Sequence, residues 1–347
     1  MSNTTTADFL LDSRGTGRAL GAWVVGAAFA RNGAACAFAL GDGTLRLARP
    51  AAMAEDWTTA AAHPGGACLA LAADGNPTGF LTGGDDGRLV ATGTDGAVQE
   101  IAQLGAMKWV EHVAAHEGGL RAASVGKLLH LFDAAGTKLK ILPTPTAVGG
   151  IAFDAKGKRV AASHYNGASL WFVAAKEDKP RVLEWKGSHG AIAISPDGTH
   201  VVTAMQENAL HGWRLEDGQH MRMSGYPSKT RFLSFTARGR WLATSGADSV
   251  VIWPFFGGGP MGKAPTELAG GDGILCTAVA CHPQHEVVAA GFADGLVVLS
   301  EIASGKVVPV AAPGRGPVSA IAWNAGGTHL AFGTETGFAG LVDLSRR

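Results

Sequence analysis

Residues 191–215, AIAISPDGTHVVTAMQENALHGWRL, decide the fold of this chain. Two short apolar runs, Ala191–Ser195 and His200–Ala204, flank the turn Pro196-Asp197-Gly198, and a third run carries Trp213. Runs this short, rich in Val, Ile and Trp and bounded by Pro, Gly, Asp and Asn, are typical of β-strands. The segment therefore predicts three strands, called a, b and c below, joined by tight turns.

The same pattern returns eight times along the 347 residues. At the a–b turn the anchor residues are Gly33, Gly75, Gly119, Gly157, Gly198, Gly239, Gln284 and Gly327. Successive anchors are 42, 44, 38, 41, 41, 45 and 43 residues apart. A period of about 40–45 residues with several short strands per unit indicates the blades of a β-propeller. We number the repeat units one to eight and expect them at 22–59, 66–104, 107–142, 148–185, 190–224, 230–268, 274–311 and 317–344.

The repeats predict one all-β domain over 1–347, a closed propeller of four-stranded antiparallel blades. Eight blades are expected, and seven is the alternative. The last c strand, 340–344, is followed by no outer strand. We expect residues 7–14, which include Phe9–Asp12, to supply that strand and close the ring, because closure removes an exposed sheet edge.

Charge and composition exclude several classes of protein. Lys and Arg total 29 and Asp and Glu total 29, so the chain lacks the basic footprint of a generic nucleic-acid binder. The amino terminus does not resemble a signal peptide, and no apolar run is long enough for membrane insertion. The four cysteines do not form a disulfide framework, so we expect a cytoplasmic protein.

The repeats resemble those of the WD40 family. Ser195–Gly198 is similar to the family's a–b turn, and Trp213 and Trp253 match the Trp that ends strand c. The resemblance implies a buried hydrogen-bonded set of His before strand a, Ser or Thr in strand b, Asp in the b–c turn and that Trp. His63 and His189 match the His, and no unit retains all four residues.

The resemblance also implies a non-catalytic scaffold that binds a protein or peptide partner on one face of the disc. No G-x-S-x-G or phosphate-binding motif is present, so no enzyme activity and no cofactor are expected. The b–c turns and the connections into strand a share one face in this family. The candidate contact residues there are Trp109, His164, Tyr165, Gln206, Glu207, Tyr226, Lys229, Arg231, Arg315 and Glu335.

Two alternatives remain open from the sequence. One is a small-ligand or enzymatic site at the central channel, where residues from several units converge. The other is a metal site formed by Cys276, Cys281, His282 and His285, since thiolate and imidazole are zinc ligands. Against the metal site, the spacing of the two cysteines is odd, which places them on opposite faces of a strand. Packing of both cysteines as small apolar side chains is the competing interpretation.

Overall fold

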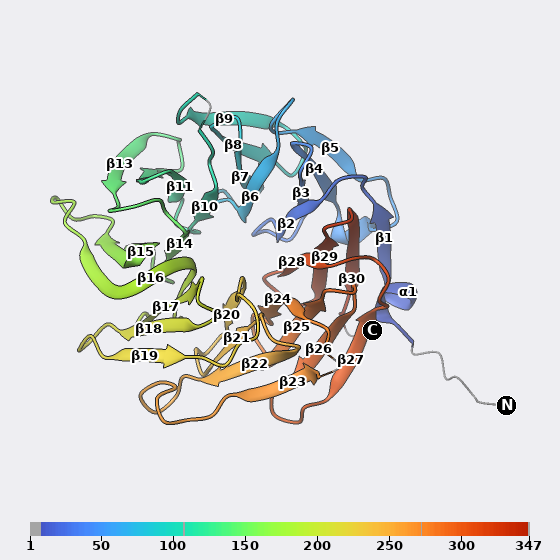
Figure 1. Cartoon of the computed structure of the whole chain (residues 1–347). Helices are drawn as coiled ribbons and strands as arrows, with labels where there is room; N and C mark the ends of the chain where they lie inside the picture. Colours follow the sequence, from blue (N-terminus) through green and yellow to red (C-terminus); the bar gives the residue numbers. More distant parts are fainter. Residues whose placement is uncertain (1–7, 107, 272, 346–347) are drawn as a thin grey trace.

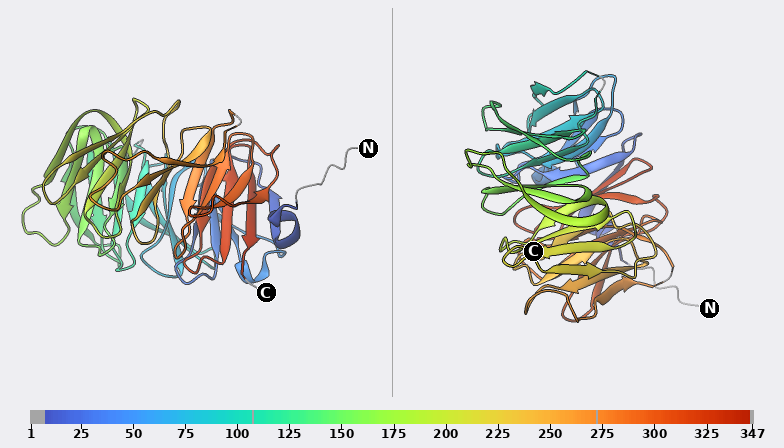
Figure 2. Two further views of the ribbon diagram at one scale, coloured as in Figure 1. Left: turned by 90° about the horizontal axis from the view of Figure 1, so that it is seen from below. Right: turned by 60° about the vertical axis from the view of Figure 1, so that its left-hand side comes forward.

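Sheets stand around a central axis in the computed structural model, which describes residues 8–106, 108–271 and 273–345 (Figure 1). The left view of Figure 2 shows the ring edge-on, with turns projecting from two opposite faces. The turns depend on glycine where φ is positive, as at Gly198 (72°) and Gly239 (65°), a region that other residues rarely adopt. Predicted unit three begins at residue 107, which lies outside the described residues.

The elements follow one another along the chain with short connections. The first part contains α1 (Leu10–Arg14), β1 (Gly15–Ala19), β2 (Val24–Phe29), β3 (Cys36–Leu40), β4 (Thr44–Ala48), the 3-10 turn η1 (Pro50–Ala52), β5 (Thr58–Ala61), β6 (Cys68–Ala73), β7 (Gly79–Gly84), β8 (Arg88–Gly93), β9 (Val98–Gln103), β10 (His112–Ala115), β11 (Arg121–Val125), β12 (Leu128–Phe132), β13 (Lys138–Pro143), β14 (Gly150–Phe153) and β15 (Arg159–Phe172). The second part contains β16 (Arg181–Ile194), β17 (His200–Met205), β18 (Leu210–Arg214), β19 (His220–Met223), β20 (Leu233–Phe235), β21 (Trp241–Thr244), β22 (Ser249–Pro254), β23 (Thr266–Gly270), β24 (Cys276–Cys281), β25 (Val287–Phe292), β26 (Val297–Glu301), β27 (Val307–Ala311), β28 (Val318–Trp323), β29 (His329–Thr334) and β30 (Phe338–Asp343). In the described ranges no helix is long and apolar enough to cross a bilayer.

Hydrogen bonding joins these strands into seven sheets. Six have four strands: β2–β5, β6–β9, β10–β13, β20–β23, β24–β27, and β28–β30 with β1. The seventh contains β14 to β19 and has six strands. Counted as hydrogen-bonded sheets, the propeller therefore has seven blades, and the prediction of eight four-stranded blades is wrong.

The cause is the continuous pairing through repeat units four and five. β15 reverses at Tyr165–Asn166, where Asn166 has a φ of 65°. β16 then pairs first with β15, as Tyr165 with Ser188, and next with β17, as His189 with Met205. Since the chain stays extended from the outer strand of unit four into the inner strand of unit five, the two units share one sheet.

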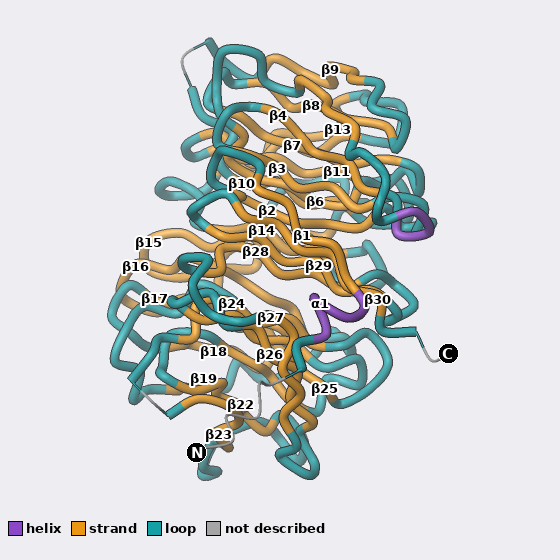
Figure 3. Tube along the Cα trace, turned by 90° about the vertical axis from the view of Figure 1, so that its right-hand side faces the viewer, coloured by secondary structure: helices purple, strands orange, loops and turns teal. Residues whose placement is uncertain are grey.

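The amino terminus completes the last blade, as predicted, but with a different segment. β1 pairs antiparallel with β30, whereas residues 10–14 of the predicted closing segment 7–14 form α1 at the outer side of that sheet (Figure 3). Residue 7 lies outside the described residues. A Cβ on Gly15 would meet the carbonyl oxygen of Leu341 at 2.9 Å. Glycine therefore allows the strand to begin where it does, and Leu11 packs behind it in the core of the blade.

Strand a of each unit faces the axis, and these strands contact one another in ring order: β2, β6, β10, β14, β16, β20, β24, β28 and again β2. Hydroxyl groups help to hold neighbours together. Thr277 donates to the carbonyl of Val318 at 2.7 Å, and Ser319 donates to that of Val24 at 2.6 Å, across the point of closure. Between the sheets lie apolar clusters built from their two facing surfaces. The result is a closed ring of inner strands around the central axis.

Candidate functional site

A cavity of about 740 Å³ opens at one end of the central channel. The b–c turns of units one and eight supply Gly41 and Glu335 to its lining, and the connection into strand a of unit six supplies Ser228 and Lys229. The cavity therefore lies on the face for which the sequence predicted partner binding. Below we call it the channel-mouth cavity.

The wall of the channel-mouth cavity is mainly apolar. It includes Trp23, Val25, Leu69, Phe232, Leu275 and Val318, which come from units one, two, six, seven and eight. Trp23 has half of its side chain exposed, an unusual state for so large an apolar group. An exposed Trp beside an apolar hollow can bury a large area against an incoming side chain.

Charged groups of opposite sign stand on the two sides of strand β24 at the cavity rim. Lys229 and Arg231 come from unit six, and Glu335 comes from unit eight. Lys229 donates to the side-chain oxygen of Gln206 at 2.7 Å. Neither Arg231 nor Glu335 forms an ion pair with a residue of the described part of the chain. Both charges are exposed and available to a ligand.

The structure thus brings three of the predicted contact residues, Lys229, Arg231 and Glu335, to one cavity, with Gln206 beside them. Arg315 is turned away, because its guanidinium lies 4.8 Å from the ring centre of Phe338 and donates to the carbonyl of Ala312. Trp109 is exposed but lines a separate cavity of about 550 Å³. Trp23 was missed, although it precedes its strand as Trp109 does, in the repeated pair Trp-Val.

The other predicted contacts divide into exposed and buried residues. Tyr165, Gln206 and Glu207 are exposed on turns of the six-stranded sheet. His164 is buried and makes hydrogen bonds to the carbonyl of Tyr165 and to Ser169. Tyr226 is buried as well. These two side chains build the blades and are not accessible to a partner on this face.

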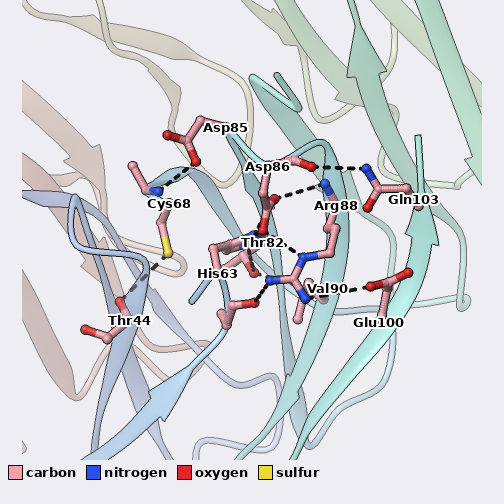
Figure 4. A network of polar contacts seen from close by, with 12 residues as sticks. Thr44, His63, Cys68, Thr82, Asp85, Asp86, Arg88, Val90, Glu100 and Gln103 are labelled. Carbon is pink, nitrogen blue, oxygen red and sulfur yellow. Dashed lines mark hydrogen bonds and ion pairs between the residues drawn. The ribbon is translucent and has the colours of Figure 1, made fainter. Parts of the chain in front are cut away.

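Unit two contains most of the hydrogen-bonded set that the family resemblance implies. Nδ1 of His63 lies 3.0 Å from Asp86, and Nε2 lies 3.0 Å from Thr82 (Figure 4). Arg88 donates to the same carboxylate at 2.7 Å. Burial lowers the pKa of His63, which Asp86 offsets in part, and hydrogen bonds hold the pKa of Asp86 below its usual value despite desolvation. The set is therefore a neutral imidazole clamped to a carboxylate.

Unit six makes an equivalent set with a different residue. The hydroxyl of Tyr226 lies 2.6 Å from Thr244 and accepts a hydrogen bond from Trp253 Nε1 at 2.6 Å. Burial raises the pKa of Tyr226 to about 12, so the phenol stays protonated. The sequence of this unit has Ser245 at the end of strand b and Asp248 in the b–c turn, but no His before strand a. A search for His alone could not find a tyrosine in its place.

The proposed metal ligands do not converge. Cys276 is buried, Cys281 contacts the carbonyl of Ser234, and His282 donates to the carbonyl of Gly327 at 3.0 Å. Burial raises the pKa of both thiols to about 12. Within residues 8–106, 108–271 and 273–345, no three His, Cys, Asp or Glu side chains lie close enough to hold a metal ion.

Comparisons with known proteins agree on the fold. No protein-family model matches the chain. Autophagy-related protein 16 of Arabidopsis thaliana is 26% identical over 151 residues, and telomerase protein component 1 of Mus musculus is 25% identical over 216 residues. The matches cover 43% and 59% of this chain, and 29% and 8% of those two WD40 proteins.

A solved structure is similar over nearly the whole chain. The crystal structure of the computationally designed Ika8 protein superposes with a TM-score of 0.75 and 17% sequence identity. The match covers 94% of this chain and 98% of that one. Identity this low shows the shared fold alone.

Proposed function

We propose, since this chain is a β-propeller of the WD40-repeat family, that it is a non-catalytic module that holds a peptide segment of a protein partner. Proteins of this family generally bind other proteins. The channel-mouth cavity carries the proposal, because it combines an apolar hollow, a half-exposed Trp23 and unpaired charges at its rim. Aromatic and Arg side chains of this kind dominate the energy of protein interfaces.

In this proposal, one large apolar side chain of the partner enters the cavity and packs against Trp23. Arg231 and Lys229 then bind a carboxylate or backbone carbonyls of the same segment, and Glu335 pairs with a cation on the other side. The charges at the rim are exposed, so their main effect is to orient the segment and speed its association.

The chemistry of the cavity supports binding rather than catalysis. Cys68 and Cys276 line it, but burial raises the pKa of each thiol to about 12, so neither is a thiolate near neutral pH. The hydroxyls of Thr277 and Ser319 donate to backbone carbonyls of neighbouring strands. The four free cysteines fit a reducing compartment, and we include cytoplasmic location in the proposal.

A photo-crosslinking amino acid at position 228, in the lining of the channel-mouth cavity, tests the proposal in a cell extract. We expect one stoichiometric protein partner, whose crosslinked peptide can be identified and synthesised. The double variant Trp23→Ala/Arg231→Glu should weaken binding of that peptide about 30-fold or more, as for the loss of interface hot spots. Arg238→Glu is the matched control, since Arg238 is exposed in the a–b turn on the opposite face of the same unit.

Two results would count against the proposal. Full peptide binding by the double variant would exclude the channel-mouth cavity as the site. A small molecule that copurifies with the protein, and whose binding Trp23→Ala abolishes, would favour the alternative of a ligand site at the axis, because the cavity volume also suits a small ligand.

A further inference from the structure

A second cleft lies on the opposite face of the disc, at the rim of the six-stranded sheet. Its volume is about 270 Å³, and it is lined by three apolar residues, Leu170, Phe172 and Pro180, and three cations, Arg159, Lys179 and Arg181. Arg159 begins the outgoing half of β15 and Phe172 ends its returning half, so the cleft is far from the b–c turn between them. We propose that this rim cleft binds an acidic protein segment that carries an aromatic side chain.

Phe172 is the largest apolar side chain that lines the cleft. Its side chain is 63% exposed, more than any other large apolar side chain that the structure describes. The neighbouring Trp171 is buried in the core, which fixes the strand that presents Phe172. An aromatic side chain of a partner can therefore pack on an exposed ring whose backbone is held in position.

Two of the three cations are also fixed. Arg159 donates to Asp154 at 2.8 Å and to the carbonyl of Gly198 at 2.9 Å. Arg181 donates to the carbonyl of Leu215. Each guanidinium has five N–H groups, so both retain donors that can bind carboxylate oxygens of a partner.

The third cation is the free charge of the cleft. Lys179 is exposed and forms no ion pair with a residue in the described ranges. Asp178 beside it is already bound to Lys140 at 2.6 Å. None of the six lining residues is acidic, and the one carboxylate that reaches Arg159, that of Asp154, is almost fully buried.

The surrounding sequence is basic in a chain without net charge. Residues 156–186 contain seven Lys or Arg and three Asp or Glu. Such a local excess attracts an acidic partner. The cleft has room for about one large side chain between cations. This size fits a single aromatic side chain of a peptide, flanked by carboxylates, better than a run of nucleic-acid phosphates.

The test uses the full chain and a fluorescent peptide of sequence GEEFEEG, followed by fluorescence anisotropy. We expect binding that weakens with added salt and is lost with the uncharged peptide GQQFQQG. The variants Phe172→Ser and Lys179→Glu should each weaken binding about tenfold or more. Both side chains are exposed, so circular dichroism and thermal melting should show unchanged folding.

Two matched controls lie close to the rim cleft but outside it. Val182→Ser removes another exposed apolar side chain, 48% exposed on β16, and Lys186→Glu reverses another exposed charge of the same strand. Binding should change less than about twofold in each, because neither side chain lines the cleft. Trp23→Ala should also leave this peptide's affinity unchanged, so failure at the rim cleft and failure at the channel mouth are distinguishable.

Several outcomes would overturn the proposal. One is equal affinity for the acidic and uncharged peptides, and another is full binding by Phe172→Ser and Lys179→Glu. A third is absence of peptide binding at millimolar concentration together with salt-sensitive binding of a single-stranded oligonucleotide or of phosphatidylserine vesicles. That last result would assign the basic rim to a different class of partner.

Discussion

Two fully buried histidines, His63 in unit two and His211 in unit five, differ in what surrounds them. Both ring nitrogens of His63 have partners, Asp86 and Thr82, each at 3.0 Å. His211 stacks on a Trp ring 4.0 Å away, and its Nε2 lies 3.0 Å from Nδ1 of His220. Its own Nδ1 has no hydrogen-bond partner in the described part of the chain.

The difference shows that the hydrogen-bond partners of a buried imidazole, more than its burial, decide how much it contributes to the stability of the fold. Burial lowers the pKa of both rings, but Asp86 opposes this at His63. At His211, desolvation is reinforced by His220, His189 and Arg222, and the pKa falls to about 3. His63 stabilises its blade through hydrogen bonds, whereas His211 is compatible with the fold only in its neutral form.

Removal of His63, whose two ring nitrogens both have hydrogen-bond partners, should have the largest effect on the free energy of unfolding. His63→Ala leaves Thr82 and Asp86 without their shared partner and opens a cavity between sheets. We expect the free energy of unfolding to fall by about 3 kcal/mol. Urea denaturation at pH 7 measures this, and a loss below about 1 kcal/mol would show that water replaces the imidazole.

Acid should lower the stability of the protein through His211. A base whose pKa is lowered on folding is protonated more easily in the unfolded chain, so its stabilising effect is complete above about pH 6.5 and falls below it. With a folded pKa of about 3, His211 alone accounts for about 2 kcal/mol of lost stability between pH 7 and pH 5. The variant His211→Phe should lose correspondingly less over the same interval, and parallel losses in the two proteins would contradict this assignment.

The tyrosine of unit six gives a test of intermediate size. Tyr226→Phe keeps the ring but removes the hydroxyl that links Thr244 to Trp253. Two buried polar groups lose a partner, and we expect a loss of about 1.5 kcal/mol. Thermal melting at pH 7 measures it, with Tyr165→Phe as the control because Tyr165 is exposed and should tolerate the change.

The smallest effect on the free energy of unfolding is expected at His211, where one buried ring nitrogen lacks a hydrogen-bond partner in the described part of the chain. At pH 7, His211→Phe should change the free energy of unfolding by less than about 1 kcal/mol, since an apolar ring can replace an imidazole that has one unpaired nitrogen. His220 is exposed, so water can replace its lost partner. A destabilisation as large as that of His63→Ala would remove the distinction between the two sites.

The sequence predicted the features that depend on local pattern. Turn glycines such as Gly198 recur because six of the eight a–b anchors have a positive φ, and the period of these anchors revealed the propeller. Closure by the amino terminus followed from the missing outer strand after residue 344. The number of sheets did not follow, because whether β16 continues from one unit into the next depends on hydrogen bonds across 181–194 that no local signal marks.

The candidate site was harder to predict because it combines distant residues. The sequence placed three charged residues on the face of the b–c turns: Lys229, Arg231 and Glu335. Their convergence with Trp23 at one cavity depends on closure of the ring, which brings distant units together. Burial removed His164 and Tyr226 from the contact list, since hydrogen bonds inside the blades use their polar atoms. A sequence shows which turn carries a side chain, whereas its direction is set by packing.

The pairing of β1 with β30 has a consequence for synthesis on the ribosome. Gly15–Ala19 is translated before its partner Phe338–Asp343, which emerges more than 300 residues later. Throughout that interval the first strand has no edge to join, and each completed blade leaves one face of the growing arc open. The nascent protein therefore lacks its final strand pairing until the last blade is made, and we expect unpaired strand edges to favour aggregation over this interval.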